Sequence, residues 1–389
     1  MICNKEDCTG CFACYNICPQ NCIDMVEDEL GYIYPMIDES KCTNCGLCKK
    51  VCINHNDIEF YMPEEAFAIW NKNQNIRKTS TSGGAATTFS KYVLNNSGVV
   101  YGAAYKGNGI VEHIRVDSEA DLYKLQGSKY VHSYIRDSFR KVKEDLLSDR
   151  TVIFFGTPCQ IAGLKLFLKR EYSKLYLVDL ICHGVSSQKF LADEINYLVG
   201  DKSIDAISFR GTDGFKFKMY YDNKLVKEVL MGHSLYYIGF MHSITYRENC
   251  YHCKFAQPKR CSDITIGDFW GIGEENECNY KQDSNLGISA VLPITSKGKN
   301  LLENVKEDIF LDRRTVSEAI NGNDQLRRPS MRHKNVNMFR KQYSKVGFQN
   351  AVKKSIYTDI IKQKIKNILK KNKLLYRVVM NIRNKETMS

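Results

Sequence analysis

The spacing of the cysteines near the N-terminus constrains this chain more than any other feature of its sequence. One pattern, Cys-x2-Cys-x2-Cys-x3-Cys, occurs twice, over residues 8–18 and 42–52, and Pro19 follows the first copy. The three closely spaced cysteines of each copy can grip one [4Fe–4S] cube, while the fourth ligates the cube of the other copy. A structural zinc site would instead use isolated cysteine pairs. The spacing therefore predicts two [4Fe–4S] clusters that hold both ends of this segment together.

The pattern also assigns the ligands of each cluster, as in bacterial ferredoxins. The first cluster takes four thiolates, from Cys8, Cys11, Cys14 and Cys52. The second takes the other four, from Cys18, Cys42, Cys45 and Cys48. Because these eight ligands complete both clusters, the nearby Cys3 and Cys22 are expected to be structural. Residues 1–58 are thus predicted to form a ferredoxin-type domain.

Length and cysteine content narrow the class of protein further. A chain of 389 residues is longer than a single hydrophobic core supports, so two or three domains are expected. Its 16 cysteines, with no apolar leader at the start, indicate a reducing compartment in which thiols serve as metal ligands. No apolar run approaches the roughly 20 residues that span a bilayer. We therefore expect a cytoplasmic protein.

Most of the formal charge of +12 lies at the C-terminal end. Residues 351–389 hold nine Lys and two Arg against Asp359 and Glu386, a net charge of +9. Iron–sulfur clusters with thiolate ligands add negative charge to the remainder, which is therefore near neutral. No nucleic-acid-binding surface is expected.

Residues 62–148 contain two motifs that suit a phosphate-bearing cofactor. A strand over 66–70 precedes a Ser/Thr/Gly motif at 80–84 and a helical pattern over 85–94, so that N–H groups and the helix dipole would converge on an anion. After a strand over 98–105, residues 127–130 join a glycine, a hydroxyl, a cation and an aromatic ring, which could hold a pyrophosphate and cover a planar ring. The alternatives are an ordinary helix cap and an ordinary turn.

Residues 149–330 predict parallel strands joined by helices. Buried strands are expected over 151–155 and 175–181, with helices over 161–169 and from Ser187 onward. A right-handed crossover places Cys159 and Cys182 at the same edge of the sheet, where open α/β sheets carry their sites. The predicted fold class is a ferredoxin-like module followed by a mixed α/β body, between the α+β and α/β types, with parallel βαβ units.

These two cysteines and a later Cys-x2-Cys pair could hold a third [4Fe–4S] cluster. The preferred ligand set is Cys159, Cys182, Cys250 and Cys253. Cys261 could replace one of them, and the same residues could hold zinc instead. His183 is a candidate catalytic proton donor, although it could equally support the site or lie in the core.

Six motifs, taken in order along residues 1–330, resemble one family. They are Ser-Thr-Ser-Gly-Gly at 80–84, Gly-Ser-Lys-Tyr at 127–130, Gly-Thr-Pro-Cys-Gln at 156–160, Cys-His-Gly at 182–184, the pair at 250–253 and Asp-Ile-Thr-Ile-Gly-Asp-Phe-Trp-Gly at 263–271. This set resembles the coenzyme F420 hydrogenase/dehydrogenase beta-subunit family, with a ferredoxin extension. The resemblance implies an N-terminal family domain over 62–148, a C-terminal one over 149–330, and FAD beside a [4Fe–4S] cluster.

The resemblance also implies which residues contact the flavin. They are Ser80, Ser82, Gly83, Gly84, Gly127, Ser128, Lys129 and Tyr130. Residues 209–215, Phe-Arg-Gly-Thr-Asp-Gly-Phe, depart from the stretch usual in the family. The deazaflavin substrate of the family, coenzyme F420, therefore does not follow from the resemblance.

We accordingly expect an iron–sulfur flavoprotein oxidoreductase. Electrons would enter the two-cluster domain, pass through the body cluster and collect on FAD for an acceptor, or move in reverse. The redox partner would be a protein or a small molecule. Two other functions are a non-catalytic electron-relay subunit of a larger complex and a reductase of a surface-polysaccharide precursor.

Residues 345–389 are predicted to form a basic amphipathic helix. Its apolar positions, spaced for one helix face among lysines, are Ile356, Ile360, Ile361, Ile365, Ile368, Leu369, Leu375, Val379 and Ile382. Such a helix can pack on the body or on a partner, or it can make peripheral contact with an anionic membrane.

Overall fold

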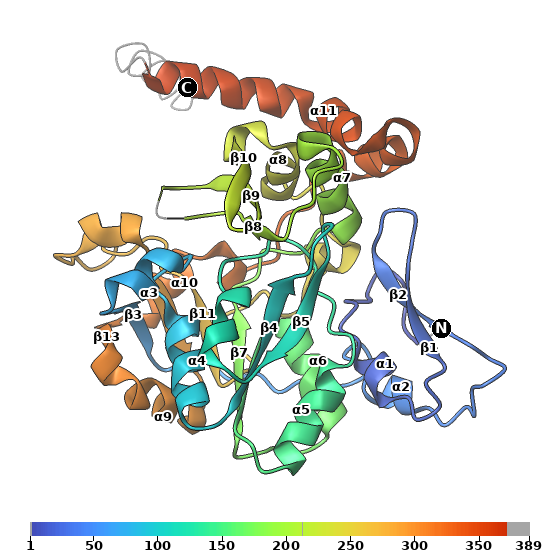
Figure 1. Ribbon diagram of the computed structural model, residues 1–389, viewed down its shortest axis with the longest axis vertical. Helices are drawn as coiled ribbons and strands as arrows, with labels where there is room; N and C mark the ends of the chain where they lie inside the picture. The colour runs from blue at the N-terminus through green and yellow to red at the C-terminus, as the bar shows by residue number, and fades with distance from the viewer. Residues whose placement is uncertain (1, 212, 372–389) are drawn as a thin grey trace, which may run out of the picture.

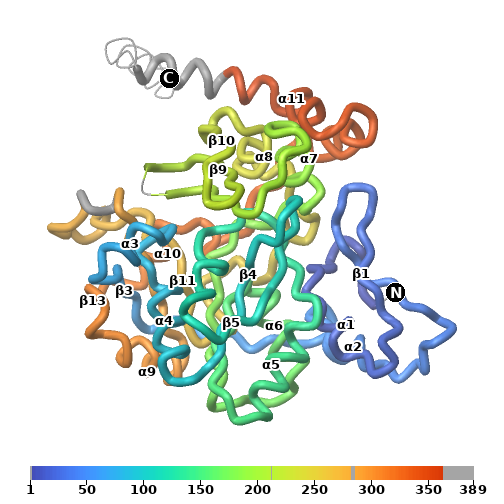
Figure 2. The backbone as a smooth tube through the Cα atoms, in the orientation of Figure 1, coloured from blue at the N-terminus to red at the C-terminus, as the bar shows by residue number. Residues whose placement is uncertain are grey.

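A computed structural model gives the fold (Figures 1 and 2). It describes residues 2–211 and 213–371, except for the side chains of 282–284 and 362–371. The described chain forms an N-terminal module, a central sheet with helices on both faces, and a small lobe that carries the last helix (Figure 1).

The N-terminal module repeats one local structure twice. Its elements are α1 (Ala13–Ile17), β1 (Ile23–Glu27), β2 (Ile33–Ile37) and α2 (Leu47–Lys50). The two strands pair antiparallel, with Ile23 opposite Ile37. Each helix carries the third cysteine of its motif and begins after a left-handed residue, Phe12 (φ 63°) or Gly46 (φ 71°). The repeated cysteine spacing thus corresponds to a repeated fold.

The central sheet is mixed and has eight strands in the order β13-β3-β12-β11-β7-β6-β4-β5. Their bounds are β3 (Ala66–Asn71), β4 (Val99–Tyr105), β5 (Val111–Val116), β6 (Val152–Gly156), β7 (Leu175–Leu180), β11 (Ile264–Asp268), β12 (Ser289–Pro293) and β13 (Ile309–Arg314). β4, β6, β7 and β11 are parallel neighbours, and the other pairs are antiparallel. The loops that follow the four parallel strands therefore leave the sheet at one carboxyl edge.

Helices cover both faces of this sheet. The α-helices of the body are α3 (Gln74–Thr79), α4 (Ala85–Asn95), α5 (Ser138–Leu147), α6 (Pro158–Leu168), α9 (Ser296–Asn304) and α10 (Val316–Asn321). Short 3-10 helices are η1 (Glu119–Lys124), η2 (Met231–His233), η3 (Glu248–His252), η4 (Lys281–Leu286), η5 (Lys306–Asp308) and η6 (Asp324–Leu326). Along β6, Val152 and Phe154 face the core under α5 and α6, whereas Ile153 faces the core under α4 and α9. Burial on both faces explains why this strand is a continuous apolar run.

The small lobe combines a three-stranded antiparallel sheet with three helices. Its elements are α7 (Gln188–Val199), β8 (Ala206–Ser208), β9 (Lys216–Tyr221), β10 (Lys224–Leu230), α8 (Leu235–Met241) and α11 (Val336–Lys371). α11 begins before the predicted 345 and breaks at Gly347 (φ 73°) and Ile356 (φ −127°). Of the predicted apolar face, Ile356 is buried in the lobe, Ile360 packs against it, and Ile361 is 36% exposed. The side chains at 365, 368, 369, 375, 379 and 382 lie outside the described part.

The N-terminal module packs against one side of the body, beside α6 (Figures 1 and 2). Five of its residues share one hydrophobic core with α5 and α6: Phe12, Ala13, Ile33, Val51 and Ile53. Arg140 on α5 donates from Nε to the carbonyl O of Asn16 (2.8 Å) and from Nη2 to that of Tyr15 (2.9 Å). Any cofactor in this module is therefore held in a fixed position beside the sheet.

The predicted fold class agrees with this mixed α/β body behind a ferredoxin-type module. The strands expected over 66–70, 98–105, 151–155 and 175–181 are present as β3, β4, β6 and β7. α6 begins earlier than expected because Thr157 and Gln160 form a capping box and Pro158 occupies the first helical position. The sequence analysis missed α3, which Asn73 caps through the N–H groups of Asn75 and Ile76.

Candidate functional site

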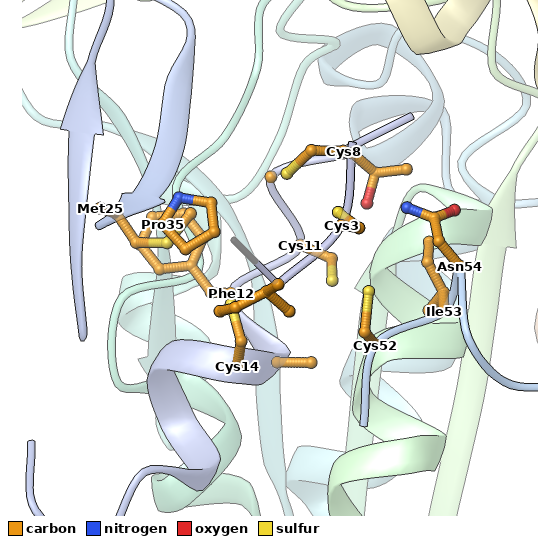
Figure 3. Close-up of a pocket in the computed structure, with 14 residues that line it drawn as sticks. Cys3, Cys8, Cys11, Phe12, Cys14, Met25, Pro35, Cys52, Ile53 and Asn54 are labelled. Atoms are coloured by element: carbon orange, nitrogen blue, oxygen red, sulfur yellow. The ribbon is translucent and has the colours of Figure 1, made fainter. Parts of the chain in front are cut away.

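One cavity of the N-terminal module gathers the thiols assigned to the first cluster (Figure 3). Apolar residues line it together with five cysteines, Cys3, Cys8, Cys11, Cys14 and Cys52. Cys52 comes from the second copy of the motif, so both ends of the module meet here. Burial, above all, raises the pKa values of Cys11 and Cys14. Such thiols ionise readily only beside positive charge, which a metal core supplies.

The thiols assigned to the second cluster lie in the same module. Cys18, Cys42 and Cys48 pack in one apolar cluster with Cys22, whereas Cys45 is exposed. Cys22 Sγ lies 3.4 Å from Cys18 Sγ. Cys3 and Cys22, which the spacing had set aside, therefore each adjoin one predicted ligand set. Within residues 2–211 and 213–371, no three His, Cys, Asp or Glu side chains converge closely enough for a single metal ion.

A second cavity lies at the carboxyl edge of the central sheet. Four cysteines from separate segments line it, Cys159, Cys182, Cys250 and Cys253. Cys159 lies in the first turn of α6, and Cys182 follows β7 by two residues. Cys250 belongs to η3, and Cys253 ends it. The fold thus brings together the preferred ligand set of the sequence analysis.

Cys261 lies outside this cavity. Its buried Sγ is 3.8 Å from the carbonyl O of Pro158 and packs in the core beside α6. The arrangement therefore favours the ligand set of Cys159, Cys182, Cys250 and Cys253, without Cys261.

The four thiols of this cavity act on one another electrostatically. Burial, followed by the charge of Cys253, raises the pKa of Cys182 to about 12. The same two causes raise the pKa of Cys159, and a hydrogen bond with the Thr157 side chain opposes this rise. Such a donor set becomes ionised when it binds a cationic core, and its chemistry therefore fits a metal cluster.

The loop from Cys8 to Cys11 forms the wall between the two cavities. Thr9 lines both of them. A Cβ on Gly163 would lie 3.0 Å from Cys11 Sγ, so this glycine of α6 lets the loop approach the helix that carries Cys159. A Cβ on Gly10 would lie 2.7 Å from Cε1 of His132, which also lines the body cavity.

Arg247 contacts the same loop from the body side. Its side chain is 1% exposed, and Nε donates to the carbonyl O of Cys8 at 2.6 Å. Its own carbonyl accepts from the Cys250 N–H at 3.0 Å. The sequence analysis missed Arg247 because a lone arginine belongs to no spacing pattern, and only the tertiary contact with Cys8 identifies it.

The two motifs predicted to contact a flavin are neighbours in space. The backbone N–H of Ser128 donates to Thr81 Oγ1 at 2.9 Å. α4 begins after Gly84 (φ 92°), and no described side chain caps its first turn. Gly127 (φ 81°) has open space where a Cβ would lie. Backbone N–H groups at the start of α4 are thus free to bind an anion.

Several side chains of these motifs already serve the protein itself. The hydroxyls of Ser80 and Ser82 donate to the carbonyls of Ile76 (2.7 Å) and Ile288 (2.9 Å). A Cβ on Gly83 would lie 2.1 Å from the carbonyl O of Ile69, so this glycine is needed for packing against β3.

Lys129 is likewise engaged within its own loop. Its Nζ donates to three carbonyls, those of Lys124 (3.4 Å), Leu125 (3.0 Å) and Gln126 (2.7 Å). Burial lowers its pKa to about 7. Lys129 thus shapes the loop that presents Gly127 and Ser128.

His183 lines the mouth of the body cavity, and its side chain is exposed. It is therefore not a core histidine. Nearby, at the end of β11, Asp268 pairs with Arg210, whose Nη1 lies 2.5 Å from Oδ2. The guanidinium lies over the rings of Phe215 (4.7 Å) and Trp270 (5.3 Å). The segment that departs from the family pattern thus contributes a cation to this edge.

Burial raises the pKa of Tyr130 above its usual range, and the charge of Asp268 adds to that rise. The Tyr130 ring packs among Phe209, Tyr237 and Phe240. It therefore connects the 127–130 loop to the small lobe.

Among the helices of the described residues, none is both long enough and apolar enough to traverse a bilayer.

Comparisons with known proteins match both cysteine sites. Residues 7–55 match the 4Fe-4S dicluster domain, and residues 149–319 match the C terminus of the beta subunit in the coenzyme F420 hydrogenase/dehydrogenase family. A coenzyme F420-dependent sulfite reductase of Methanocaldococcus jannaschii is 28% identical over 325 residues, which are 78% of this chain and 47% of that protein. An uncharacterized ferredoxin of the same organism is 36% identical over 52 residues, 13% of this chain and 66% of the ferredoxin. The chain thus spans about half the length of the reductase.

Among solved structures, a chain of the F420-reducing [NiFe] hydrogenase complex from Methanosarcina barkeri superposes with a TM-score of 0.42. It shares 16% identity, and the superposition covers 68% of this chain and 91% of the hydrogenase chain. The two domain matches contain the predicted ligands at both cavities: the dicluster match contains Cys8, Cys11, Cys14 and Cys52 of the first, and the beta-subunit match contains the four cysteines of the second. Two parts of the chain therefore match known domains, the 4Fe–4S dicluster domain and the C terminus of the beta subunit in the coenzyme F420 hydrogenase/dehydrogenase family.

Proposed function

We propose that this protein is an iron–sulfur flavoprotein oxidoreductase. Two [4Fe–4S] clusters would lie in the N-terminal module, a third in the cavity of Cys159, Cys182, Cys250 and Cys253, and FAD beside α4. The single observation that carries this proposal is that Thr9 lines both cysteine cavities. Cofactors bound in them would be separated by the Cys8–Cys11 loop and by His132, which packs against it.

The residues of the chain have distinct parts in this proposal. The four body cysteines would ligate one cluster, and His132 and Thr9 would separate it from the first ferredoxin cluster. Bound clusters exchange single electrons, and a bound flavin exchanges one electron or two. Docking by Arg140 and the shared apolar core would keep the distance between the sites constant.

A flavin is supported by the start of α4 and the adjoining loop. The free N–H groups after Gly84 would bind its pyrophosphate, and Gly127 leaves room for close approach. His183, exposed at the mouth of the body cavity, would exchange a proton with solvent or acceptor. Arg210 and Asp268 would shape the acceptor side.

Anaerobic reconstitution of cysteine variants tests the cluster count. The intact protein should bind about 12 irons, four for each of three clusters, together with FAD. Cys159→Ser and Cys250→Ser should each lose the spectroscopic signal of one cluster. Cys261→Ser is the matched control, since this buried cysteine lies outside the cavity, and it should retain all three clusters. A protein with about eight irons and no flavin, or one in which all three variants behave alike, would reject the proposal.

The identity of the acceptor separates the enzyme from a relay subunit. The similar M. jannaschii protein is named a coenzyme F420-dependent sulfite reductase, so coenzyme F420, assayed as electron donor and as acceptor, and sulfite, assayed as acceptor, come first. Catalytic electron transfer from the reduced coenzyme through the protein to sulfite would support an enzyme of that type. Bound flavin that is reoxidised only by a partner protein would indicate an electron-relay subunit. Turnover of a nucleotide-linked sugar instead would indicate action on a surface-polysaccharide precursor.

A further inference from the structure

Arg247 contacts a cysteine of each cavity through the polypeptide backbone. Its Nε donates to the carbonyl of Cys8, a predicted ligand of the first cluster. Through its own carbonyl it anchors the N–H of Cys250, a predicted ligand of the body cluster. Its Cζ would lie 3.5 Å from a Cβ on Gly10, in the wall that separates the cavities.

The outer end of this side chain is buried without a hydrogen-bond partner. Among the described residues, neither Nη1 nor Nη2 has one, and no carboxylate forms an ion pair with Arg247. The guanidinium does lie over two aromatic rings, with Cζ 4.2 Å from the ring centroid of Tyr34 and 6.0 Å from that of Tyr32. A guanidinium cannot give up its proton in a protein, so burying it without a counter-charge is costly. The described polypeptide does not supply that counter-charge.

Both neighbouring cavities are suited to negatively charged groups. A [4Fe–4S] cluster with four thiolate ligands carries a net negative charge, and one-electron reduction adds one more negative charge.

We propose that Arg247 is a shared counter-charge for the first ferredoxin cluster and the body cluster, and that it holds their reduction potentials up. This inference rests on the proposed clusters and goes beyond their ligands. A fixed positive charge stabilises the reduced, more negative state of each cluster. Removing the charge should therefore move the midpoint potentials to more negative values. Arg247 is a positioning and tuning residue, because it ligates neither cluster.

The test compares three variants of the full chain by anaerobic redox titration, with electron paramagnetic resonance as the readout and iron content as the check. Arg247→Gln removes the charge, and Arg247→Lys keeps a charge but changes the bond to Cys8. Arg140→Gln is the matched control, since Arg140 also donates to carbonyls of the N-terminal module, but to those of Asn16 and Tyr15, which are not predicted cluster ligands. We expect a negative shift in Arg247→Gln, a smaller one in Arg247→Lys, and none in Arg140→Gln.

Unchanged potentials in Arg247→Gln at full iron content would overturn the inference. So would equal shifts in the Gln and Lys variants, because the lost bond to Cys8 would then explain both. Arg247→Gln could instead fail to retain iron. Retention of iron by Arg247→Lys would then support the need for a positive charge at this position, whereas loss of iron from both variants would overturn the inference. A wild-type protein without the body cluster would instead reject the proposed function, and this is established before any variant is compared.

Discussion

At the scale of single residues, the buried ion pair of Asp179 and Arg260 organises the loop that carries Cys253. The two side chains are 0% and 2% exposed and meet at 2.6 Å, and Asp179 also accepts from Thr265 Oγ1 at 2.5 Å. Arg260 further donates to the carbonyls of Phe255 (2.9 Å) and Gln257 (3.3 Å). The pair thus connects β7 and β11 to the turn after the Cys250–Cys253 motif.

Replacing Asp179 by Asn should destabilise the protein strongly. The substitution leaves the Arg260 charge buried without its carboxylate, and breaking such a pair costs about 3–5 kcal/mol. Anaerobic urea unfolding, followed by the fluorescence of Trp70 and Trp270, measures the loss. Lys306→Ala is the control, because its pair with Glu303 is exposed and screened by solvent. Similar unfolding midpoints for the two variants would contradict this account.

At the scale of one element, α6 is the helix on which both cysteine cavities depend. Its first turn carries Cys159, and one turn later Gly163 faces Cys11 of the N-terminal module. Glycine normally weakens a helix interior. Here the missing side chain is what allows the Cys8–Cys11 loop to lie against the helix.

Enlarging Gly163 should therefore damage the first cluster site. A Cβ would lie 3.0 Å from Cys11 Sγ and 3.2 Å from Cys11 Cβ, so Gly163→Ala should not bring the usual stabilisation of about 0.5–1 kcal/mol, and Gly163→Val should push the loop away. Iron content and the thermal midpoint of the reconstituted protein report both effects. Glu144→Ala, at an exposed position of α5, should leave iron content unchanged. A stabilised Gly163→Ala variant with all its iron would contradict the tight approach.

At the scale of the whole molecule, the beginning of α11 completes the small lobe. Seven of its hydrophobic residues are buried there: Val336, Phe339, Tyr343, Phe348, Ala351, Val352 and Ile356. The burial of these side chains favours packing against the small lobe for the part of α11 up to Ile356. The predicted membrane contact concerns the basic residues that follow.

Two truncations should separate these roles. A chain that ends at residue 361 keeps the seven buried side chains and should fold, whereas one that ends at residue 335 loses them. Each large apolar side chain of the set contributes roughly 1.5–3 kcal/mol, so the shorter chain should be digested rapidly in limited proteolysis. Co-sedimentation with anionic vesicles then compares the 361-residue chain with the full one. Equal binding would remove the membrane proposal, and equal protease resistance of the two truncations would contradict the role of α11.

The sequence by itself determined the local features of the protein. Thiolate spacing identified the two-cluster module, because three of the four ligands of each cube lie close together along the chain. Mostly apolar segments located β3, β4, β6 and β7, because strands buried on both faces are rich in apolar residues. The position of Cys159 and Cys182 after parallel strands also predicted that they would meet at one edge of the sheet.

Tertiary structure alone decided what depends on contacts between distant segments. It separated Cys261 from the four cysteines of the body cavity, since Cys261 packs beside α6 instead. It placed Thr9 in the wall of both cavities and buried Arg247 against Cys8. These contacts join segments that are far apart in the sequence. The burial of a charge and the approach of two loops depend on the packing of the whole chain, so no local sequence pattern predicts them.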